Sequence, residues 1–340
     1  MMKAWEIGPK AGIGGLRLAG RAALTPGPGE VLVDVLAAGL NYRDLMVLDG
    51  NYGNNLPETR VPLADGVGRI AALGEGAGGW APGDRVIAPH FISWLDGPFA
   101  MAAFGRDLGA TLDGWLAEQL VLPAAALLRV PDSLSDMSAA TLSVVGGTVW
   151  HAMVEFGAAG PGSLVLAQGT GGVSVFTLQL AKALGAEVAI TSSSEAKLEH
   201  CRALGADYTI NYRERPDWSA ALLEATGGRG ADVVVDTLGF PAMGETVAAC
   251  AVNARIGTVG ALAGTAQSPV GVSQGLLIAR NITIKGVASG SRKMLEQAMN
   301  AMAKSGSQMI VDRSFAFADA PAAYEHLASG AHLGKVAITV

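Results

Sequence analysis

The chain of 340 residues is long enough for two domains, and with 50% hydrophobic and 16% charged residues it has the composition of a globular protein with a large core. A net charge of -6 gives no support for a nucleic-acid partner. No apolar run reaches the length of a membrane span, the first residues lack the apolar core of a signal peptide, and two cysteines cannot form a disulfide framework. We therefore expect a cytoplasmic protein with no membrane or nucleic-acid partner.

Residues 1–127 predict a β-rich domain of short strands and turns that contain Gly or Pro. In PGPGEVLVDVLAAG (26–39) a turn precedes an alternating strand, with Val31, Val33 and Val35 on one face and Asp34 on the other. The segments RIAALGEG and APGDRVIAP add two more strands. These elements do not complete a domain by themselves, so we expect later parts of the chain to complete it.

From Pro131 onward, helices and strands alternate. The stretch 163–194 begins with a buried parallel strand, which is followed by a glycine turn, a helix and a second strand. From Leu164 to residue 289 we count six strands, the number of a doubly wound dinucleotide-binding sheet. A helix at about 292–304 and the last segment are expected to return to the first domain. The predicted organisation is a catalytic domain of residues 1–127 and 292–340, with a Rossmann domain inserted at 128–291.

The turn after the first strand of this unit predicts the dinucleotide site. Gly169 and Gly171 occupy the first two positions of G-x-G-x-x-G, but Ser174 stands at the third. Glycines permit a positive φ, and without Cβ atoms they let a pyrophosphate reach the backbone N–H groups at the helix start. The residues expected to contact the cofactor here are Gly169, Thr170, Gly171, Gly172 and Val173. The alternative is a tight turn from strand to helix that binds nothing.

The end of the second strand predicts which dinucleotide is bound. NAD-binding domains carry an acidic residue there, whereas this chain has Ser192 and Ser193, and no carboxylate before Glu195. Ser192 and Glu195 have the spacing of a capping box, which would fold Glu195 back onto its own helix. Lys197 and, fifteen residues later, Tyr212 complete a set that suits the 2′-phosphate of NADPH. Alternatively, the serines only cap a helix and Lys197 is solvated surface.

A series of motifs resembles the medium-chain dehydrogenase/reductase superfamily, and specifically its zinc-free, quinone-oxidoreductase-like branch. They are AAGLNYRDL (37–45), PGDRV (82–86), GTGGVSVF (169–176), the Ser-Ser-x-x-x-Lys segment ending at Lys197, INYRE (210–214), VDTLG (235–239) and HLGKV (332–336). The resemblance runs nearly end to end. It implies an α/β protein with a GroES-like catalytic domain, a Rossmann domain, a cleft between them, and a homodimer or tetramer. It also implies that Lys197 and Tyr212 hold the 2′-phosphate of NADPH.

Departures from the zinc-dependent members predict chemistry without a metal. Asn41 stands in place of their catalytic cysteine, Leu63, Ala64 and Asp65 replace their Gly-His-Glu motif, and the four-cysteine structural zinc loop is missing. A catalytic zinc site needs three ligands of Cys, His or carboxylate type, which this set cannot provide. Alcohol oxidation depends on such a Lewis acid, but reduction of an electrophilic acceptor does not. We therefore expect a zinc-independent, NADPH-dependent oxidoreductase that transfers hydride to a small quinone-type molecule.

Three residues of the first domain are candidates for catalysis. Asn41 is expected to donate an amide N–H to the oxygen anion that forms on the acceptor. Tyr52 lies eleven residues further on, at a spacing that resembles the proton donor of mitochondrial-type enoyl reductases of this superfamily. For Tyr52 a loop aromatic over the cleft mouth is an equal alternative, and for the third candidate, Tyr42, the alternative is packing. Thr148, at a helix start, is expected to contact the nicotinamide side of the cofactor, again with packing as the alternative.

Residues 51–61 and four aromatic side chains are expected to shape an apolar substrate pocket; the aromatics are Phe91, Trp94, Phe99 and Phe104.

Other functions stay open. One is an NADPH-dependent alkenal or enone reductase with Tyr52 as proton donor, and another is a zinc-free protein similar to alcohol dehydrogenases. A further alternative is an NADPH-binding protein with a structural or regulatory role and little turnover.

Overall fold

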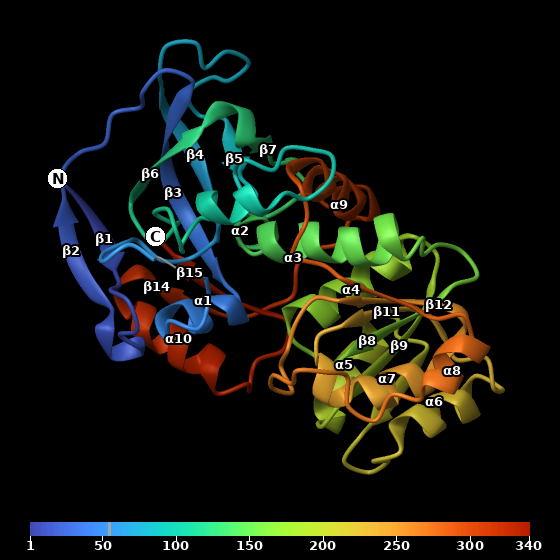
Figure 1. Ribbon diagram of the computed structural model, residues 1–340. Coiled ribbons are helices and arrows are strands. Elements are labelled where there is room, and N and C mark those ends of the chain that lie inside the picture. Colours follow the sequence, from blue (N-terminus) through green and yellow to red (C-terminus); the bar gives the residue numbers. More distant parts are fainter. Residues whose placement is uncertain (54–55) are drawn as a thin grey trace. The chain divides into compact units, whose positions relative to one another are not determined.

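The computed structural model describes residues 1–53 and 56–340, and its contacts divide the chain into two units. Unit 1 comprises residues 1–147 and 291–340, and unit 2 comprises residues 148–290 (Figure 1). Unit 2 is thus an insertion, but the first division lies later than the expected 127/128. Residues 128–147 belong to unit 1 because β7 (Leu128–Arg129) pairs with β5 (Arg85–Ile87), and α2 (Asp136–Ala140) packs on strands of the same sheet.

Among the described residues of unit 1, the main element is a seven-stranded sheet in the order β14-β15-β3-β4-β5-β7, with β6 also paired to β3. Its remaining strands are β3 (Glu30–Leu40), β4 (Asp65–Leu73), β6 (Gln119–Pro123), β14 (Val311–Ala316) and β15 (Lys335–Thr339). β1 (Met2–Glu6) and β2 (Arg17–Arg21) form a separate antiparallel pair. In Figure 1 the red C-terminal strands lie beside the blue β3, so the end of the chain completes this domain, as expected.

Alternating polarity fixes how β3 lies in its sheet. Val31, Val33 and Val35 are buried while Asp34 is exposed, because successive side chains of a strand point to opposite faces. The helices of unit 1 are α1 (Tyr42–Leu48), α2, α9 (Arg292–Ser305) and α10 (Ala320–Ala328); α3 (Ser143–Val149) spans the division between the units. Short 3₁₀ segments occur at Ile13–Gly15, Met101–Arg106, Ala124–Ala126 and Phe317–Asp319, and in unit 2 at Phe240–Ala242.

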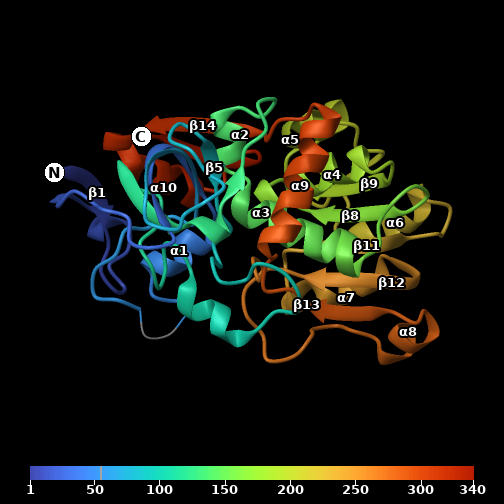
Figure 2. The same ribbon diagram turned by 90° about the horizontal axis from the view of Figure 1, so that it is seen from above.

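Within residues 148–290, which are all described, six parallel strands form one sheet in the order β10-β9-β8-β11-β12-β13 (Figure 2). This is the order of the doubly wound dinucleotide-binding fold. The strands are β8 (Leu164–Gln168), β9 (Glu187–Ser192), β10 (Tyr208–Asn211), β11 (Ala231–Asp236), β12 (Cys250–Thr258) and β13 (Thr283–Gly286). The chain reverses direction across the sheet between β8 and β11, and ligands of such folds bind at the carboxyl ends of strands at that point.

The helices of unit 2 follow the strands in alternation. They are α4 (Gly172–Ala183), α5 (Glu195–Ala203), α6 (Trp218–Ala225), α7 (Met243–Ala248) and α8 (Gln274–Ala279), and a π-helical segment, Trp150–Phe156, continues α3. β8 is buried along its whole length, as expected for a central parallel strand with both faces covered. Every helix in the described part of the chain falls short of the length and apolar character that crossing a membrane would require.

Candidate functional site

The turn between β8 and α4 has the geometry of a phosphate cradle. Gly169 has a φ of 81°, a conformation that side chains with a Cβ rarely adopt, and Gly171 caps α4 with a φ of -79°. A Cβ atom added to either glycine would meet no described atom within 4 Å. The space in front of the first turn of α4 is therefore open, and the backbone N–H groups of that turn are available to an anion. These residues fit a dinucleotide.

Ser174 explains why the third glycine of the motif can be replaced. Its side chain is buried, and its Oγ donates a hydrogen bond to the backbone oxygen of Gln168 at 2.6 Å. The hydroxyl thereby joins the first turn of α4 to the end of β8. Thr170, between the two glycines, is also buried, while Gly171, Gly172 and Val173 are partly exposed.

The start of α5 differs from the predicted capping box. The N-cap is Ser194, whose Oγ accepts a hydrogen bond from the backbone N–H of Lys197 at 3.4 Å. The prediction that Ser192 and Glu195 cap the helix is wrong. Ser192 is the last residue of β9 and accepts from the N–H of Ser194, while Glu195 forms an ion pair with Arg202 at 2.6 Å. The first carboxylate after β9 is thus already paired and is not folded back onto the helix start.

Two of the four residues predicted for the 2′-phosphate, Ser192 and Tyr212, meet at the carboxyl ends of β9 and β10. Ser192 pairs with Asn211 in the sheet, and the N–H of Tyr212 donates to the oxygen of Ser192 at 3.0 Å. Ser193 follows directly, and Lys197 lies in the first turn of α5. Tyr212 is 42% exposed, so its ring is accessible to a ligand.

Thr148 lies on α3 and is connected to the segment after β13. Its Oγ1 lies 3.2 Å from Oγ of Ser289, and Nδ1 of His151 lies 2.6 Å from the backbone oxygen of Ser289. Nζ of Lys285 lies 3.1 Å from Nε2 of His151. Burial lowers the pKa of His151, and the nearby Lys285 lowers it further, against the raising effect of the contact with the backbone oxygen of Ser289. These contacts fix the segment after β13 against the helix that carries Thr148.

In unit 1, three adjacent strands bring a buried polar network together at Asn41. Val336 of β15 pairs with Leu40, and Gly39 of β3 pairs with Asp65 at the start of β4. Lys335 therefore lies beside both Asn41 and Asp65. Its Nζ donates to Oδ1 of Asn41 at 2.5 Å and to Oδ2 of Asp65 at 3.2 Å. All three side chains are buried.

This network determines which end of the Asn41 amide is free. An ammonium group can only donate hydrogen bonds, so the amide must turn its oxygen toward Lys335. The amide nitrogen, Nδ2, is buried and has no hydrogen-bond partner within residues 1–53 and 56–340. Since a buried donor without an acceptor is costly, Nδ2 is suited to an acceptor on a ligand. The position agrees with the predicted role of Asn41 as a donor to an oxygen anion.

The other two catalytic candidates have different surroundings. Tyr42 is 54% exposed. The hydroxyl of Tyr52 donates to Oδ2 of Asp107 at 3.0 Å, and the guanidinium carbon of Arg43 lies 4.4 Å from the centre of its ring. Burial raises the pKa of Asp107 to about 6, and also raises the pKa of Tyr52 well above its ordinary value. Of the loop 51–61, residues 54 and 55 lie outside the described residues.

The four aromatics expected to line a pocket pack mainly on one another. Phe91 contacts Phe104 and Trp94 contacts Phe99, both edge to face, with ring centres 5.2 Å and 5.1 Å apart. Phe91 and Trp94 are buried, and Phe104 is 37% exposed. These side chains therefore form the small core of the loop they belong to.

The donor set does not fit a zinc ion. Within residues 1–53 and 56–340, no three His, Cys, Asp or Glu side chains come together as a metal site. Of the three positions where the resemblance to zinc-dependent enzymes would place ligands, Ala64 has no side-chain donor atom, and Asn41 and Asp65 both accept from the ammonium of Lys335. The oxygens of Asn41 and Asp65 are therefore already bonded to a positively charged group of the protein itself.

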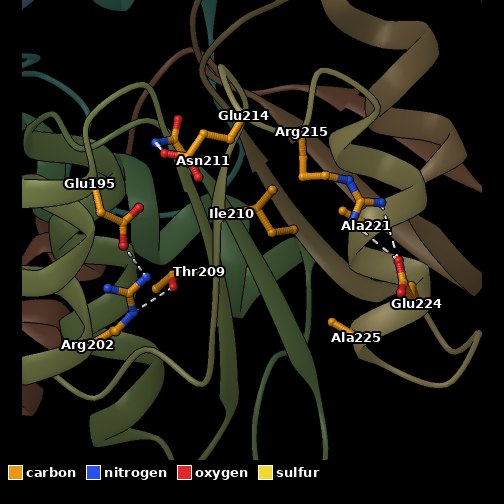
Figure 3. Close-up of a pocket in the computed structure, with 10 residues that line it drawn as sticks. All are labelled: Glu195, Arg202, Thr209, Ile210, Asn211, Glu214, Arg215, Ala221, Glu224 and Ala225. Atoms are coloured by element: carbon orange, nitrogen blue, oxygen red, sulfur yellow. Dashed lines mark hydrogen bonds and ion pairs between the residues drawn. The ribbon is translucent and has the colours of Figure 1, made fainter.

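A surface hollow of about 600 Å³ lies between α5, β10 and α6 (Figure 3). Arg202 pairs with Glu195 and Arg215 with Glu224, while Glu214 accepts a hydrogen bond from the amide of Asn211. None of the residues predicted to contact the cofactor, neither those of the glycine turn nor Ser192, Ser193, Lys197 and Tyr212, lines it. We do not assign this hollow to the cofactor site.

The strand order of unit 2, together with the open glycine turn at its point of reversal, defines a Rossmann domain of the dinucleotide-binding type. Two family models match: the alcohol dehydrogenase GroES-like domain at residues 27–132 and zinc-binding dehydrogenase at residues 172–304. The chain belongs to the medium-chain dehydrogenase/reductase superfamily and is an oxidoreductase with a GroES-like and a Rossmann domain.

Three similar proteins illustrate the relationship. A zinc-type alcohol dehydrogenase-like protein of Schizosaccharomyces pombe is 39% identical over 92% of this chain and 91% of its own length. An acryloyl-coenzyme A reductase of Metallosphaera sedula is 29% identical over 92% of this chain and 93% of its own. A crystal structure from Sinorhizobium meliloti, provisionally named an alcohol dehydrogenase, has a TM-score of 0.92 and 37% identity, covering 100% of this chain and 98% of that one.

Some residues of the site were not found from sequence. In the sequence Lys335 stands out only as part of the HLGKV motif, although it is the one charged residue of the mainly apolar strand KVAITV. A lysine in such a strand indicates a buried polar site, since a buried ammonium group needs hydrogen-bond acceptors close by. Arg43 and Asp107 are separated by 64 residues, and no local pattern connects them.

Proposed function

We propose that this protein is a zinc-independent, NADPH-dependent reductase of a quinone-type electrophilic acceptor. The observation that supports it concerns the buried Asn41 amide. Its oxygen accepts from Lys335, and its nitrogen, Nδ2, has no hydrogen-bond partner among the described residues. A fixed donor of this kind stabilises negative charge that develops on oxygen. Hydride transfer to a quinone produces such a charge, on the oxygen of the hydroquinone anion.

The residues of the chain then have separate tasks. A bound nicotinamide dinucleotide supplies the hydride. The glycine turn holds its pyrophosphate, and Asn41 donates a hydrogen bond to the oxygen of the acceptor. Tyr52 is not needed as an acid for a quinone, because solvent can protonate the hydroquinone anion, and its hydroxyl already donates to Asp107.

Two features support NADPH as the dinucleotide. Ser192, Ser193 and Tyr212 lie at the carboxyl ends of adjacent strands, where the adenosine ribose of a doubly wound fold is bound, and Lys197 lies in the first turn of the helix that follows β9. The nearby Glu195 is paired with Arg202. Hydroxyls and an ammonium attract a 2′-phosphate, and a free carboxylate would repel it.

A second acceptor class is favoured by one specific finding. The relative from Metallosphaera sedula is an acryloyl-coenzyme A reductase, which by its name acts on a double bond conjugated to a carbonyl group. Reduction of such a bond forms an enolate, whose oxygen anion the Asn41 amide can stabilise equally well. An alkenal or enone is therefore the alternative acceptor.

The test is NADPH consumption by the purified, metal-free protein with a benzoquinone, a naphthoquinone, an alkenal and an enone. NADH and added zinc serve as controls. Oxidation that depends on a quinone and prefers NADPH supports the main proposal, whereas activity only with the alkenal or enone supports the alternative. NADPH binding without turnover of any acceptor would support a binding role, and turnover only with added zinc would overturn zinc independence.

The proposal includes a homodimer in the cytoplasm. β13 is the last strand in the sheet order of residues 148–290, so one of its edges is available to another strand. Unit 2 also exposes large apolar side chains, among them Val252 at 63% and Ile278 at 71%. Both cysteines are unpaired, as is usual in reducing compartments. Sedimentation equilibrium distinguishes dimer from monomer and tetramer.

A further inference from the structure

Lys335 is a buried cation whose contacts determine the state of the Asn41 side chain. It is 3% exposed, and its two acceptors, Asn41 and Asp65, are separated from it by 294 and 270 residues along the chain. Asp65 balances its charge and also accepts from the backbone N–H of Val144 at 2.8 Å. A buried ammonium is tolerated only with such compensation.

An asparagine amide has two ends of nearly equal size but opposite hydrogen-bonding character. Without a constraint, the side chain of Asn41 could present either the oxygen or the nitrogen to a ligand. The ammonium of Lys335 removes that freedom because it accepts no hydrogen bond. The backbone is fixed as well, since the N–H of Asn41 donates to Oδ2 of Asp44 at 2.8 Å.

The hydrogen bond from Lys335 to the Asn41 oxygen also changes the donor strength of Nδ2 at the other end of the amide. A positive charge at the amide oxygen draws electron density from the amide, which makes its N–H groups stronger donors. This effect is larger in a buried site than in water, because the surroundings screen it less. Lys335 can thus act on a ligand that it does not touch.

We propose that Lys335 is a positioning residue for the reduction: it fixes the Asn41 amide with Nδ2 toward the acceptor and strengthens that donor through the amide. The inference rests on the proposed function of Asn41 as the donor to the oxygen anion. It adds a second residue, on a distant strand, whose ammonium group holds the oxygen of the Asn41 amide and so directs Nδ2 away from itself.

The test uses 4-nitrophenolate, a stable oxygen anion, and the full-length protein saturated with NADP⁺. The variants are Asn41→Ala, Lys335→Met and the double variant, with nitrobenzene as an uncharged probe. We expect each single substitution to weaken phenolate binding by about 10- to 100-fold, with little change for nitrobenzene. The double variant should lose no more than the single variants, because Lys335 acts only through Asn41.

Activity and matched variants complete the design. With the best acceptor, kcat should fall by about 100-fold in Lys335→Met while the KM for NADPH stays the same. Lys335→Arg, which keeps the donors and the charge, should restore part of the loss. Arg85→Met is the matched control, since it removes a partly buried cation of the same sheet that bonds to Pro131, Leu134 and Asp136. It should leave phenolate binding intact.

The inference would be overturned if the losses of phenolate affinity in the two single variants multiplied in the double variant. It would also be overturned if folded Lys335→Met bound the phenolate with full affinity. If Lys335→Met does not fold because Asp65 is left unpaired, Lys335→Met/Asp65→Leu removes both charges and must show the same loss. If the protein turns over an acceptor but the effects of the Asn41 and Lys335 substitutions on phenolate binding are independent, only the role of Lys335 is refuted and the proposed function stands. Coupled phenolate binding without turnover of any acceptor refutes the proposed function and leaves the role of Lys335 standing.

Discussion

Tyr52 and Arg43 donate hydrogen bonds to the same oxygen atom, Oδ2 of Asp107, each at 3.0 Å. Arg43 also donates to the backbone oxygen of Leu108 at 3.1 Å. The phenolic proton is therefore engaged in a buried ion-pair cluster. Burial and the neighbouring carboxylate also raise the pKa of Tyr52, which makes the phenol a weaker acid. The relationship favours a structural role for this tyrosine.

Tyr52→Phe should therefore affect stability more than catalysis. The variant loses one hydrogen bond to a charged group, and we expect the free energy of unfolding to fall by about 1 to 3 kcal/mol. Turnover of the best acceptor should stay within about 3-fold of wild type, because solvent protonates the product. Tyr42→Phe, at an exposed position, is the control for stability. A loss of turnover with intact NADPH binding would instead identify Tyr52 as the proton donor.

Asn41→Asp tests the donor itself. The carboxylate keeps the shape of the side chain and pairs with Lys335, but it has no N–H and adds negative charge where the oxygen anion would form. We expect kcat to fall by about 100- to 1000-fold with the dissociation constant of NADPH unchanged. Steady-state kinetics and a fluorescence titration with NADPH measure the two quantities. Wild-type turnover in this variant would exclude Asn41 as the donor.

Lys197→Ala should reduce discrimination between the two dinucleotides. It removes a cation expected to contact the 2′-phosphate, so NADPH binding should weaken by about 10-fold or more while NADH binding does not change. Lys182→Ala is the control, because Lys182 lies near the end of α4 and pairs with Asp207 at 2.8 Å. Equal weakening of NADPH and NADH by Lys197→Ala would argue against a phosphate contact.

The two glycines of the turn should respond differently to alanine. Gly171→Ala is compatible with a φ of -79°, so stability should stay the same while affinity for both dinucleotides falls, because the new Cβ enters the space of the pyrophosphate. Gly169→Ala should also destabilise the protein, by about 1 kcal/mol, because its φ is 81°. Thermal unfolding and NADPH titration separate these effects. Unchanged affinity in both variants would place the dinucleotide elsewhere.

Asp44 should make stability depend on pH. Burial raises its pKa from 3.8 to about 6, against the lowering effect of Arg43. A carboxyl that binds its proton more tightly in the folded state stabilises the fold at low pH, and this contribution is lost as pH rises from about 4 to about 6. Asp44→Asn removes the dependence, so relative to wild type its free energy of unfolding should increase by about 2 kcal/mol between pH 4 and pH 7. Urea unfolding at both pH values measures the change. The prediction would be contradicted if the free energies of unfolding of Asp44→Asn and wild type differed by the same amount at pH 4 and at pH 7.

The sequence alone was sufficient for features that depend on local pattern. The alternation Val31, Val33, Val35 predicted β3, and the apolar runs separated by helical stretches predicted all six strands of unit 2. Gly169 and Gly171 marked the cradle, because a positive φ and the absence of a Cβ are properties of the residue type itself. Local capping was less predictable: three serines precede α5, and only the structure shows that Ser194 is the cap.

The tertiary structure decided which residues meet. Lys335 reaches Asn41 because β15 enters the sheet beside β3, and Tyr52 reaches Asp107 across 55 residues of chain. Such pairs leave no trace in the spacing of residues, because contact depends on the order of strands in a sheet and not on distance along the chain. The sequence by itself therefore determined the β-rich and the Rossmann domain, and it marked the glycine turn at which we expect the dinucleotide to bind. Strand order placed Lys335 beside Asn41 and so determined which way the Asn41 amide faces, because the ammonium group can only donate hydrogen bonds.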